Sequence, residues 1–206
     1  MEKREFNVLI AGVGGQGNLL SSEIIATAAV IEGFKVRVAD VFGAAQRGGS
    51  VLSHIRIGEV YSPVIPTGAA NVLLGFEPIE CLRASRLLSP DCTAIVNTRP
   101  IYPRDVCIGE AEYPKINEIV AILKRLAKRL IYRDFVKLAE KAGSPRTLNV
   151  VMVGCLSGLN ILPIKKETFL KVIPESVPKG TEEVNLRAFN LGYEYIRKEL
   201  GGSACL

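Results

Sequence analysis

Metal-binding side chains are scarce in this sequence. Its 206 residues include one histidine, His54, and five cysteines, an odd number of widely separated residues that never occur as Cys-x-x-Cys. Zinc and iron–sulfur sites take several of their ligands from closely spaced cysteine or histidine residues. The sequence therefore predicts neither kind of metal site, and we expect its cysteines to be buried, reduced thiols.

Long uninterrupted apolar runs are also missing. The most apolar stretch, residues 150–162, is broken by two glycines, a serine and an asparagine, and it is shorter than the roughly 20 residues that span a bilayer. The first residues, MEKREFN, are followed by only a few apolar residues before a glycine-rich turn, which argues against a secretory signal. We therefore expect a cytoplasmic protein without a transmembrane helix.

The chain has no linker rich in proline or glycine, no repeat and no low-complexity segment. This predicts a single domain over residues 1–206. The apolar fraction of 48% is high beside 23% charged residues, which is typical of a sheet buried between helices or of a large subunit interface. A net charge of +5 suits an anionic ligand or partner but is too small to indicate nucleic-acid binding.

Apolar periodicity predicts strands that alternate with helices, followed by a helical carboxyl-terminal portion. Strands are expected at residues 6–11, 35–41, 50–57, 71–75, 93–97 and 106–108, and helices at 18–32, 78–88, 116–130, 132–142, 146–159, 165–172 and 182–200. The first 41 residues then form one βαβ unit. We expect an α/β fold: a single Rossmann-like domain with a mostly parallel sheet and right-handed crossovers.

A glycine-rich turn joins the first expected strand to the first expected helix. In LIAGVGGQGN, residues 9–18, Gly12, Gly14 and Gly17 match G-x-G-x-x-G. Small residues allow the sharp turn and let an anion approach the main chain, where the amides at the helix start point at it. In this context the motif predicts a phosphate-binding turn, with a ligand-free tight turn as the alternative.

Asp40 bears on which phosphate ligand the turn could bind. It lies 23 residues after Gly17 at the end of the second expected strand, where a dinucleotide fold places its ribose-binding carboxylate. It fits a strand-end turn residue equally well. Against a nicotinamide or flavin enzyme, nothing else resembles a hydride-transfer site, His54 falls within a strand pattern, and the chain is short for a second, substrate-binding domain.

A second glycine cluster follows the second expected strand, in AQRGG at residues 45–49. Gly48 and Gly49 permit a close backbone approach, and Arg47 could clamp a phosphate or carboxylate with two hydrogen bonds. The alternative is a solvated loop arginine.

Together the two clusters resemble the gamma-type subunit or domain of the 2-oxoacid:ferredoxin oxidoreductases, and most closely the beta subunit of indolepyruvate:ferredoxin oxidoreductase. The resemblance rests on GVGGQG at 12–17, AQRGGSVLSHIRIG at 45–58, SPVIPTGAANVLLGFEPIECLRA at 62–84, NVVMVGCLSG at 149–158 and NLRAFNLGYE at 185–194. The sequence departs from that branch at Ala44, where methionine is frequent, and at Asn71, where aspartate is common. Both departures bear on substrate detail.

The resemblance implies a heteromeric enzyme in which this chain is inactive alone and supplies no catalytic residue. A larger partner subunit then holds thiamine diphosphate and iron–sulfur clusters, decarboxylates the 2-oxoacid and passes electrons to ferredoxin, while the acyl group leaves as a coenzyme A thioester. This chain lacks the Gly-Asp-Gly…Asn segment of thiamine diphosphate sites. The glycine turn is expected to face the assembled active site. The expected assembly is a heterotetramer or a homodimer.

Coenzyme A carries a diphosphate and a 3′-phosphate, which both clusters could bind. The expected site comprises Gly12, Gly14, Gly15, Gln16, Gly17, Arg47, Gly48 and Gly49, with amides of the first turn on the diphosphate and Arg47 in a charge-assisted contact. Gln16 could instead reach across the subunit boundary. Asn149 either caps the following helix or contacts ligand.

Three alternatives therefore stay open at this stage. The first is the oxidoreductase subunit, the second a self-sufficient NAD(P)- or FAD-dependent enzyme, and the third a scaffold with an empty loop. The basic face at residues 124–133 is either solvated or a partner contact.

Overall fold

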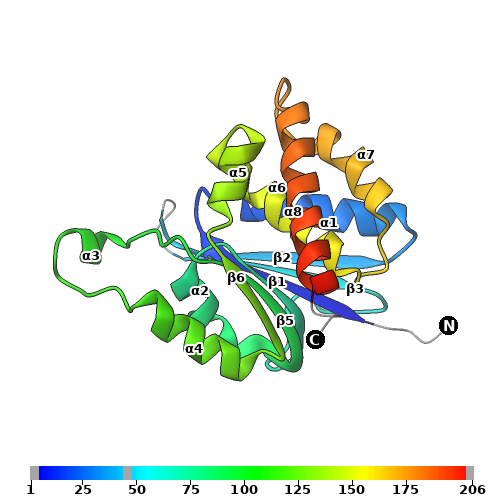
Figure 1. Ribbon diagram of the computed structural model, residues 1–206. Helices are drawn as coiled ribbons and strands as arrows, with labels where there is room; N and C mark the ends of the chain where they lie inside the picture. The colour runs from blue at the N-terminus through cyan, green and yellow to red at the C-terminus, as the bar shows by residue number, and fades with distance from the viewer. Residues whose placement is uncertain (1–4, 44–47, 203–206) are drawn as a thin grey trace.

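A computed structural model describes residues 5–43 and 48–202. Its strands form one sheet of six, in the order β2-β3-β1-β4-β5-β6, with helices on both faces (Figure 1). The strands are β1 Phe6–Val13, β2 Val36–Phe42, β3 Ser50–Ile57, β4 Ala70–Gly75, β5 Leu88–Asn97 and β6 Arg129–Arg133. The helices are α1 Asn18–Ile31, α2 Pro78–Arg83, α3 Arg104–Cys107, α4 Ile116–Leu126, α5 Val136–Ala142, α6 Leu148–Leu159, α7 Lys166–Ser176 and α8 Glu182–Gly202, with short 3₁₀ turns at Ser85–Leu87 and Pro145–Thr147.

The sheet is mostly parallel, which confirms the predicted fold class. Strand β1 pairs in parallel with β4, β4 with β5, and β5 with β6. Strand β3 runs antiparallel to both neighbours, β1 and β2. The predicted βαβ unit is present, but β3 lies between its two strands, so β1 and β2 are not neighbours.

Three expected elements are wrong. Residues 129–133, expected at a helix end and in the next helix start, form strand β6, because their apolar residues Leu130 and Ile131 pair with β5. The strand expected at 106–108 is absent from that position, where the short helix α3 covers Arg104–Cys107. The helix expected at 78–88 ends at Arg83, and β5 already begins at Leu88.

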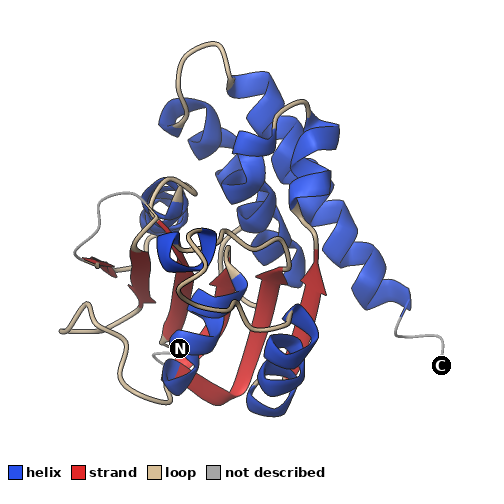
Figure 2. Cartoon of the chain, turned by 90° about the vertical axis from the view of Figure 1, so that its left-hand side faces the viewer, coloured by secondary structure: helices blue, strands red, loops and turns tan. Residues whose placement is uncertain are grey.

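The core has two layers, one on each face of the sheet. Helices α1, α5, α6, α7 and α8 cover the face that presents Val8, Ile10 and Leu74, and α2 and α4 cover the opposite face (Figure 2). Three cysteines are buried in these layers as expected: Cys81, Cys92 and Cys155. The expectation is wrong for Cys107, which is exposed on α3, and Cys205 lies outside the described residues.

The closest helix contact, between α6 and α8, has glycines on both sides. A Cβ atom at Gly154 would collide with the carbonyl oxygen of Phe189, and one at Gly192 would collide with the carbonyl oxygen of Val151. The two backbones therefore touch directly. Among the described helices, none is both long and apolar enough to cross a membrane.

We predict that Gly192→Ala lowers the free energy of unfolding by about 1–3 kcal/mol, because the added methyl group overpacks the α6–α8 contact. Gly201→Ala is the control, since a Cβ at that position of α8 meets open space. It should leave the stability unchanged or raise it by up to about 1 kcal/mol through helix propensity. Urea denaturation measures both. Equal stability of the two variants would contradict the close contact.

Candidate functional site

The main candidate site is a pocket of about 770 Å³ at the carboxyl end of the parallel strands. Its walls come from the glycine turn after β1, from the segment that follows β5, and from the starts of α5, α6 and α8. Ligands of open α/β sheets bind at this edge. The pocket therefore lies where the fold class predicts a site.

Two helices, α1 and α6, begin at this pocket. Helix α1 follows Gly17, whose backbone is left-handed (φ 83°), and α6 follows Thr147. Neither start has a side-chain cap, and neither first turn holds an acidic residue. Helix α6 continues the 3₁₀ turn Pro145–Thr147, which Ser144 caps, and the first α6 amide, that of Leu148, already donates to the carbonyl of Pro145. The free amides are therefore those at the start of α1, while the positive dipole ends of both helices attract an anion. Helix α8 also begins here, but its first turn carries Glu182 and Glu183.

The two charged residues in the pocket wall are Arg99 and Arg146. Arg99 forms ion pairs with Asp134 at 2.8 Å and with Glu140 at 2.9 Å. Its hydrogen bond to Asp134 helps raise the pKa of Arg99. Arg146 is exposed and makes no ion pair with the described residues. Arg146 is therefore the guanidinium that can meet an anionic ligand.

The rest of the wall contains no side chain that could exchange a proton near neutral pH. Its polar residues are amides and hydroxyls such as Asn97, Ser144 and Thr181, and its floor includes Leu20 and Val136. Arginine stays protonated in proteins. Within the described chain, this pocket is therefore suited to binding and not to acid–base catalysis.

A hydrogen-bonded hub holds two residues of the pocket wall, Gln16 and Asn97. The carbonyl oxygen of Phe76, just after β4, accepts hydrogen bonds from the side-chain amides of Gln16 and Asn97, both at 3.0 Å. The Gln16 oxygen accepts from the amide of Val13 at 2.9 Å, and the Asn97 oxygen accepts from the amide of Phe135 at 3.0 Å. The hub thus joins the segments that follow β1, β4, β5 and β6.

Part of the predicted glycine turn serves its own geometry. The amide of Gly14 donates to the carbonyl of Gly49 at 2.9 Å, and that of Gln16 donates to Val13 at 3.2 Å. Gly12 lies within β1, where a Cβ would come within 2.8 Å of the Gln16 side chain. Gly15 and Gly17 line the pocket, and no backbone acceptor for their amides is found in the described residues.

The two glycine clusters meet. The Gly14–Gly49 hydrogen bond places the second cluster beside the first, and Gly48 has a positive φ of 71°. Arg47 lies outside the described residues. On this side of the turn is a smaller cavity of about 410 Å³, whose lining includes Asn18. The buried Oδ1 atom of Asn18 has no hydrogen-bond partner in the described chain.

Asp40 is not placed for a dinucleotide ribose. Strand β3 separates β2 from β1, so Asp40 pairs with Ser53 and lies two strands, roughly 10 Å, from the strand that leads into the turn. Its carboxylate lies 3.5 Å from the Ser22 hydroxyl. His54 is buried, its Nδ1 accepts from the amide of Ile65 at 3.2 Å, and burial lowers its pKa. Asp40 and His54 thus contact other parts of the fold, and neither lines the main pocket.

Asn149 does not cap α6, because the cap position is Thr147 and Asn149 lies inside the helix. Its side chain packs against Gly17, where a Cβ would come within 2.6 Å of the amide nitrogen. Asn149 thus links the starts of α6 and α1 at the pocket. Sequence reasoning missed Arg146 as a site residue; its only signal was its position at the start of the helix expected at 146–159.

A buried carboxylate supports the wall on the β5 side. The side chain of Glu77 is fully buried and accepts hydrogen bonds from the Tyr113 hydroxyl at 2.6 Å and the amides of Glu80 at 3.0 Å and Ile101 at 3.3 Å. Burial raises its pKa, against the opposing effect of the hydrogen bond from Tyr113. Glu77 thereby fixes Ile101, which lines the pocket.

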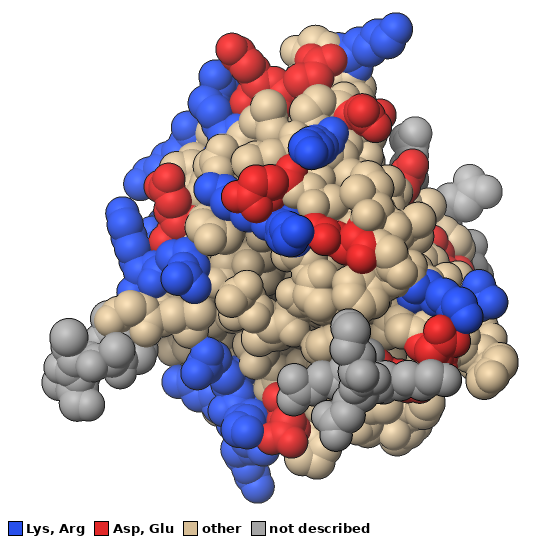
Figure 3. Space-filling model, turned by 90° about the vertical axis from the view of Figure 1, so that its right-hand side faces the viewer, with Lys and Arg blue, Asp and Glu red and all other residues tan. Residues whose placement is uncertain are grey.

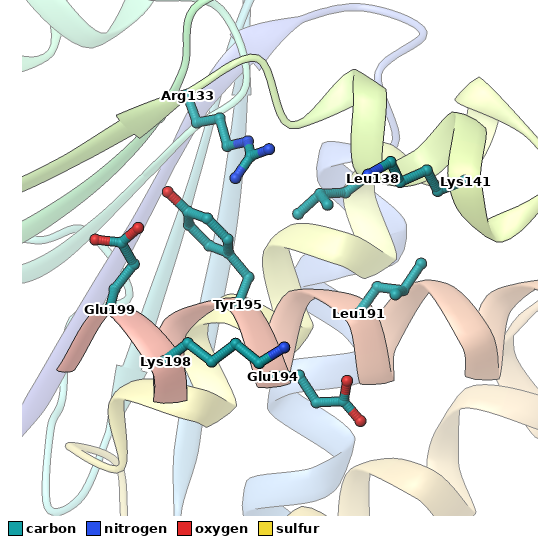
Figure 4. A pocket seen from close by; sticks show the side chains of 8 residues that line it. All are labelled: Arg133, Leu138, Lys141, Leu191, Glu194, Tyr195, Lys198 and Glu199. Carbon is teal, nitrogen blue, oxygen red and sulfur yellow. The ribbon is translucent and has the colours of Figure 1, made fainter. Parts of the chain in front are cut away.

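Another cavity, of about 670 Å³, lies between α5 and α8 (Figure 4). Its lining mixes Arg133, Lys141 and Lys198 with Glu194 and Glu199, and the Arg133 guanidinium lies 4.8 Å from the centre of the Tyr195 ring. On the face in Figure 3, positive and negative side chains are likewise interspersed. The cavity between α5 and α8 and the face in Figure 3 thus carry charges of both signs, whereas the two charged residues in the main pocket wall are both arginines.

Among the described residues, no group of three or more histidine, cysteine, aspartate or glutamate side chains could hold a metal ion. The described part of the chain therefore offers no ligand set for an iron–sulfur cluster.

Comparison with known proteins gives consistent matches over nearly the whole chain. Residues 7–195 match the family described as pyruvate ferredoxin/flavodoxin oxidoreductase. The chain is 43% identical over 187 residues to the indolepyruvate oxidoreductase subunit IorB of Archaeoglobus fulgidus, an alignment that covers 91% of this chain and 93% of that protein.

Two solved structures share the fold. One is the gamma subunit of a keto/oxoacid ferredoxin oxidoreductase from Geobacter sulfurreducens (TM-score 0.69, 22% identity, 93% of this chain and 98% of that chain). The other is the 2-oxoglutarate:ferredoxin oxidoreductase from Magnetococcus marinus with 2-oxoglutarate, coenzyme A and succinyl-CoA bound (TM-score 0.70, 21% identity, 96% of this chain and 32% of that chain).

We predict a pH-dependent stability difference between the wild type and Glu77→Gln. The pKa of Glu77 is raised in the folded state. Its contribution to the free energy of unfolding is therefore fully present below the ordinary glutamate pKa, and it is lost as the pH rises through the raised pKa. The free energy of unfolding of the wild type relative to Glu77→Gln should therefore fall as the pH rises from about 4. Urea denaturation at several pH values measures it. Glu175→Gln, at an exposed glutamate of α7, is the control, and an equal slope in both comparisons would contradict the prediction.

Proposed function

Because this chain belongs to the pyruvate ferredoxin/flavodoxin oxidoreductase family, we propose that it is the smaller subunit of an indolepyruvate-type 2-oxoacid:ferredoxin oxidoreductase. Its support is the 43% identity to the archaeal subunit IorB at matching length. The proposed complex oxidatively decarboxylates an aryl-pyruvate with coenzyme A, forms the acyl-CoA and passes the electrons to ferredoxin in the cytoplasm.

We assign thiamine diphosphate and the iron–sulfur clusters to a larger partner subunit. The described residues of this chain do not fit either group, since they offer no cluster ligands and the sequence has no Gly-Asp-Gly…Asn segment. This chain contributes binding and positioning, and it is inactive alone.

The pocket at the sheet edge is proposed to receive the phosphates of coenzyme A. One observation carries this assignment: the starts of α1 and α6, whose first turns hold no acidic residue, and the unpaired Arg146 line the same cavity. Both features favour an anion with several oxygen acceptors. Coenzyme A is bound in the Magnetococcus marinus enzyme, which shares this fold over 32% of its matched chain.

Each residue then has a stated role. The amides of Gly15 and Gly17 donate to the diphosphate, and Arg146 makes a charge-assisted contact. Arg47 stays a proposed second cation from the neighbouring loop. Gly12, Gly14, Gln16, Gly48 and Gly49 shape the turn, since Gly14 and Gln16 already use their polar groups within the chain.

A self-sufficient nicotinamide or flavin enzyme is less consistent with the topology. The antiparallel strand β3 removes Asp40 from the neighbouring position that a dinucleotide fold requires. The pocket wall also lacks a group for acid–base catalysis. If no ligand binds in a titration, the result would favour the remaining alternative, a scaffold with an empty turn.

We predict that Arg146→Ala weakens coenzyme A binding by about tenfold to a hundredfold, because it removes a charge-assisted hydrogen bond worth roughly 1.5–3 kcal/mol. Isothermal titration of the purified chain, and of the complex with the larger subunit, measures the dissociation constant. Lys137→Ala is the matched control, because Lys137 is an exposed cation of α5 outside the pocket wall. It should change the affinity less than twofold.

Titrations with NAD and FAD complete this experiment. Micromolar binding of either would favour the self-sufficient enzyme, and absence of binding by all three ligands in the complex would favour the scaffold. An equal loss in Arg146→Ala and Lys137→Ala would indicate general charge attraction and would contradict the site.

A further inference from the structure

An arm, defined as residues 101–114, projects from the body of the protein between β5 and α4, with α3 near its tip (Figure 1). It starts at the wall of the main pocket, since Arg99, Pro100 and Ile101 all line that cavity. The arm is thus joined to the site while its tip points away from the rest of the chain.

The arm exposes large apolar side chains. Tyr102 is 56% exposed, Ile108 is 55% exposed and Ile101 is 41% exposed. The hydrogen bonds found around α3 stay within the arm, such as Ile108 N–H to Arg104 O at 3.0 Å and Glu110 N–H to Asp105 O at 2.8 Å. Contacts with the rest of the chain therefore stabilise the tip little, although its ordering costs conformational entropy.

The base of the arm, in contrast, is held firmly. Glu77, fully buried, accepts hydrogen bonds from the first arm residue, Ile101, at 3.3 Å and from Tyr113 near the end at 2.6 Å. The rings of Tyr102 and Tyr113 meet edge to face with their centres 5.2 Å apart. A fixed base and an apolar tip are suited to insertion into another surface.

The charge of the arm indicates the chemistry of that surface. Its charged residues are one cation, Arg104, and three anions, Asp105, Glu110 and Glu112, which give the arm a net charge of −2 in a chain of +5, and the cation Lys115 directly follows the arm. No ion pair of the four charged side chains of the arm is found among the described residues. The complementary surface is an apolar cleft bordered by basic side chains.

We infer that the arm docks into such a cleft on the larger subunit of the proposed complex, an inference that rests on the proposed function. Docking would place the larger subunit at the mouth of the main pocket, because the arm begins in the pocket wall. Ile108 is the central apolar contact, and Glu110 and Glu112 meet the basic border. Glu77 positions the arm without touching the partner.

The test is the dissociation constant between the purified chain and the larger subunit. Ile108→Glu should raise it at least tenfold, because a carboxylate would have to enter an apolar cleft. Ile161→Glu is the matched control: Ile161 is another exposed isoleucine, 38% exposed, outside the arm. It should change the constant less than twofold, and unchanged thermal unfolding of both variants would show that the fold is intact.

Two further measurements make the outcome specific. Glu110→Lys/Glu112→Lys should also weaken assembly and should reduce its dependence on salt, because the charge attraction is lost. Hydrogen exchange in residues 101–114 should slow when the larger subunit is added. Coenzyme A titration of Ile108→Glu should match the wild type, because Ile108 lies outside the pocket.

Unaltered assembly of Ile108→Glu would overturn the inference. So would a homodimer of the isolated chain that Ile108→Glu dissociates, because the arm would then dock on a second copy. A wild-type chain that does not bind the larger subunit would overturn both this inference and the proposed function. A wild-type complex that binds no coenzyme A, yet loses assembly in Ile108→Glu, would overturn only the coenzyme A assignment.

Discussion

The site depends on one shared acceptor, the carbonyl oxygen of Phe76. Two side-chain amides, from Gln16 and Asn97, converge on it, and the other end of each amide holds the backbone of Val13 or Phe135. Parallel strands have no short turns to align their ends, so this network does so through side chains. Since the hub is largely buried, loss of either amide would leave polar groups without partners. The glycine turn, the arm and the start of α5 consequently keep fixed relative positions.

The second constraint is the direct contact of the α6 and α8 backbones at Gly154 and Gly192. It brings the start of α6 against the glycine turn, where Asn149 packs on Gly17. Two helix ends that would be separately weak anion sites thus act on one cavity. The first turns of both helices hold no acidic residue, so neither positive dipole end is neutralised within its own helix and both can attract an anion.

Sequence periodicity predicted most elements and the mostly parallel sheet, because the apolar pattern of a strand or helix is local. It failed where long-range pairing decides the outcome. Residues 129–133 have a pattern that continues a helix, yet they pair with β5 as a strand, and nothing local indicates that β3 inserts between β1 and β2. For the site, the glycine turn was predictable from its motif. Arg146 was not, because only the fold brings it beside a turn some 130 residues earlier in the chain.

The composition of the pocket wall explains why such a chain would need a partner. Its two charged side chains are arginines, which bind anions but do not exchange protons, and its remaining polar groups are amides and hydroxyls. Interactions of this kind can hold and orient a phosphate-bearing ligand, and orientation alone can lower a barrier substantially. The reacting groups must then come from outside this wall. The arm, which is fixed at the pocket by Glu77 and apolar at its tip, is the element of this chain best placed to bring the surface that carries them.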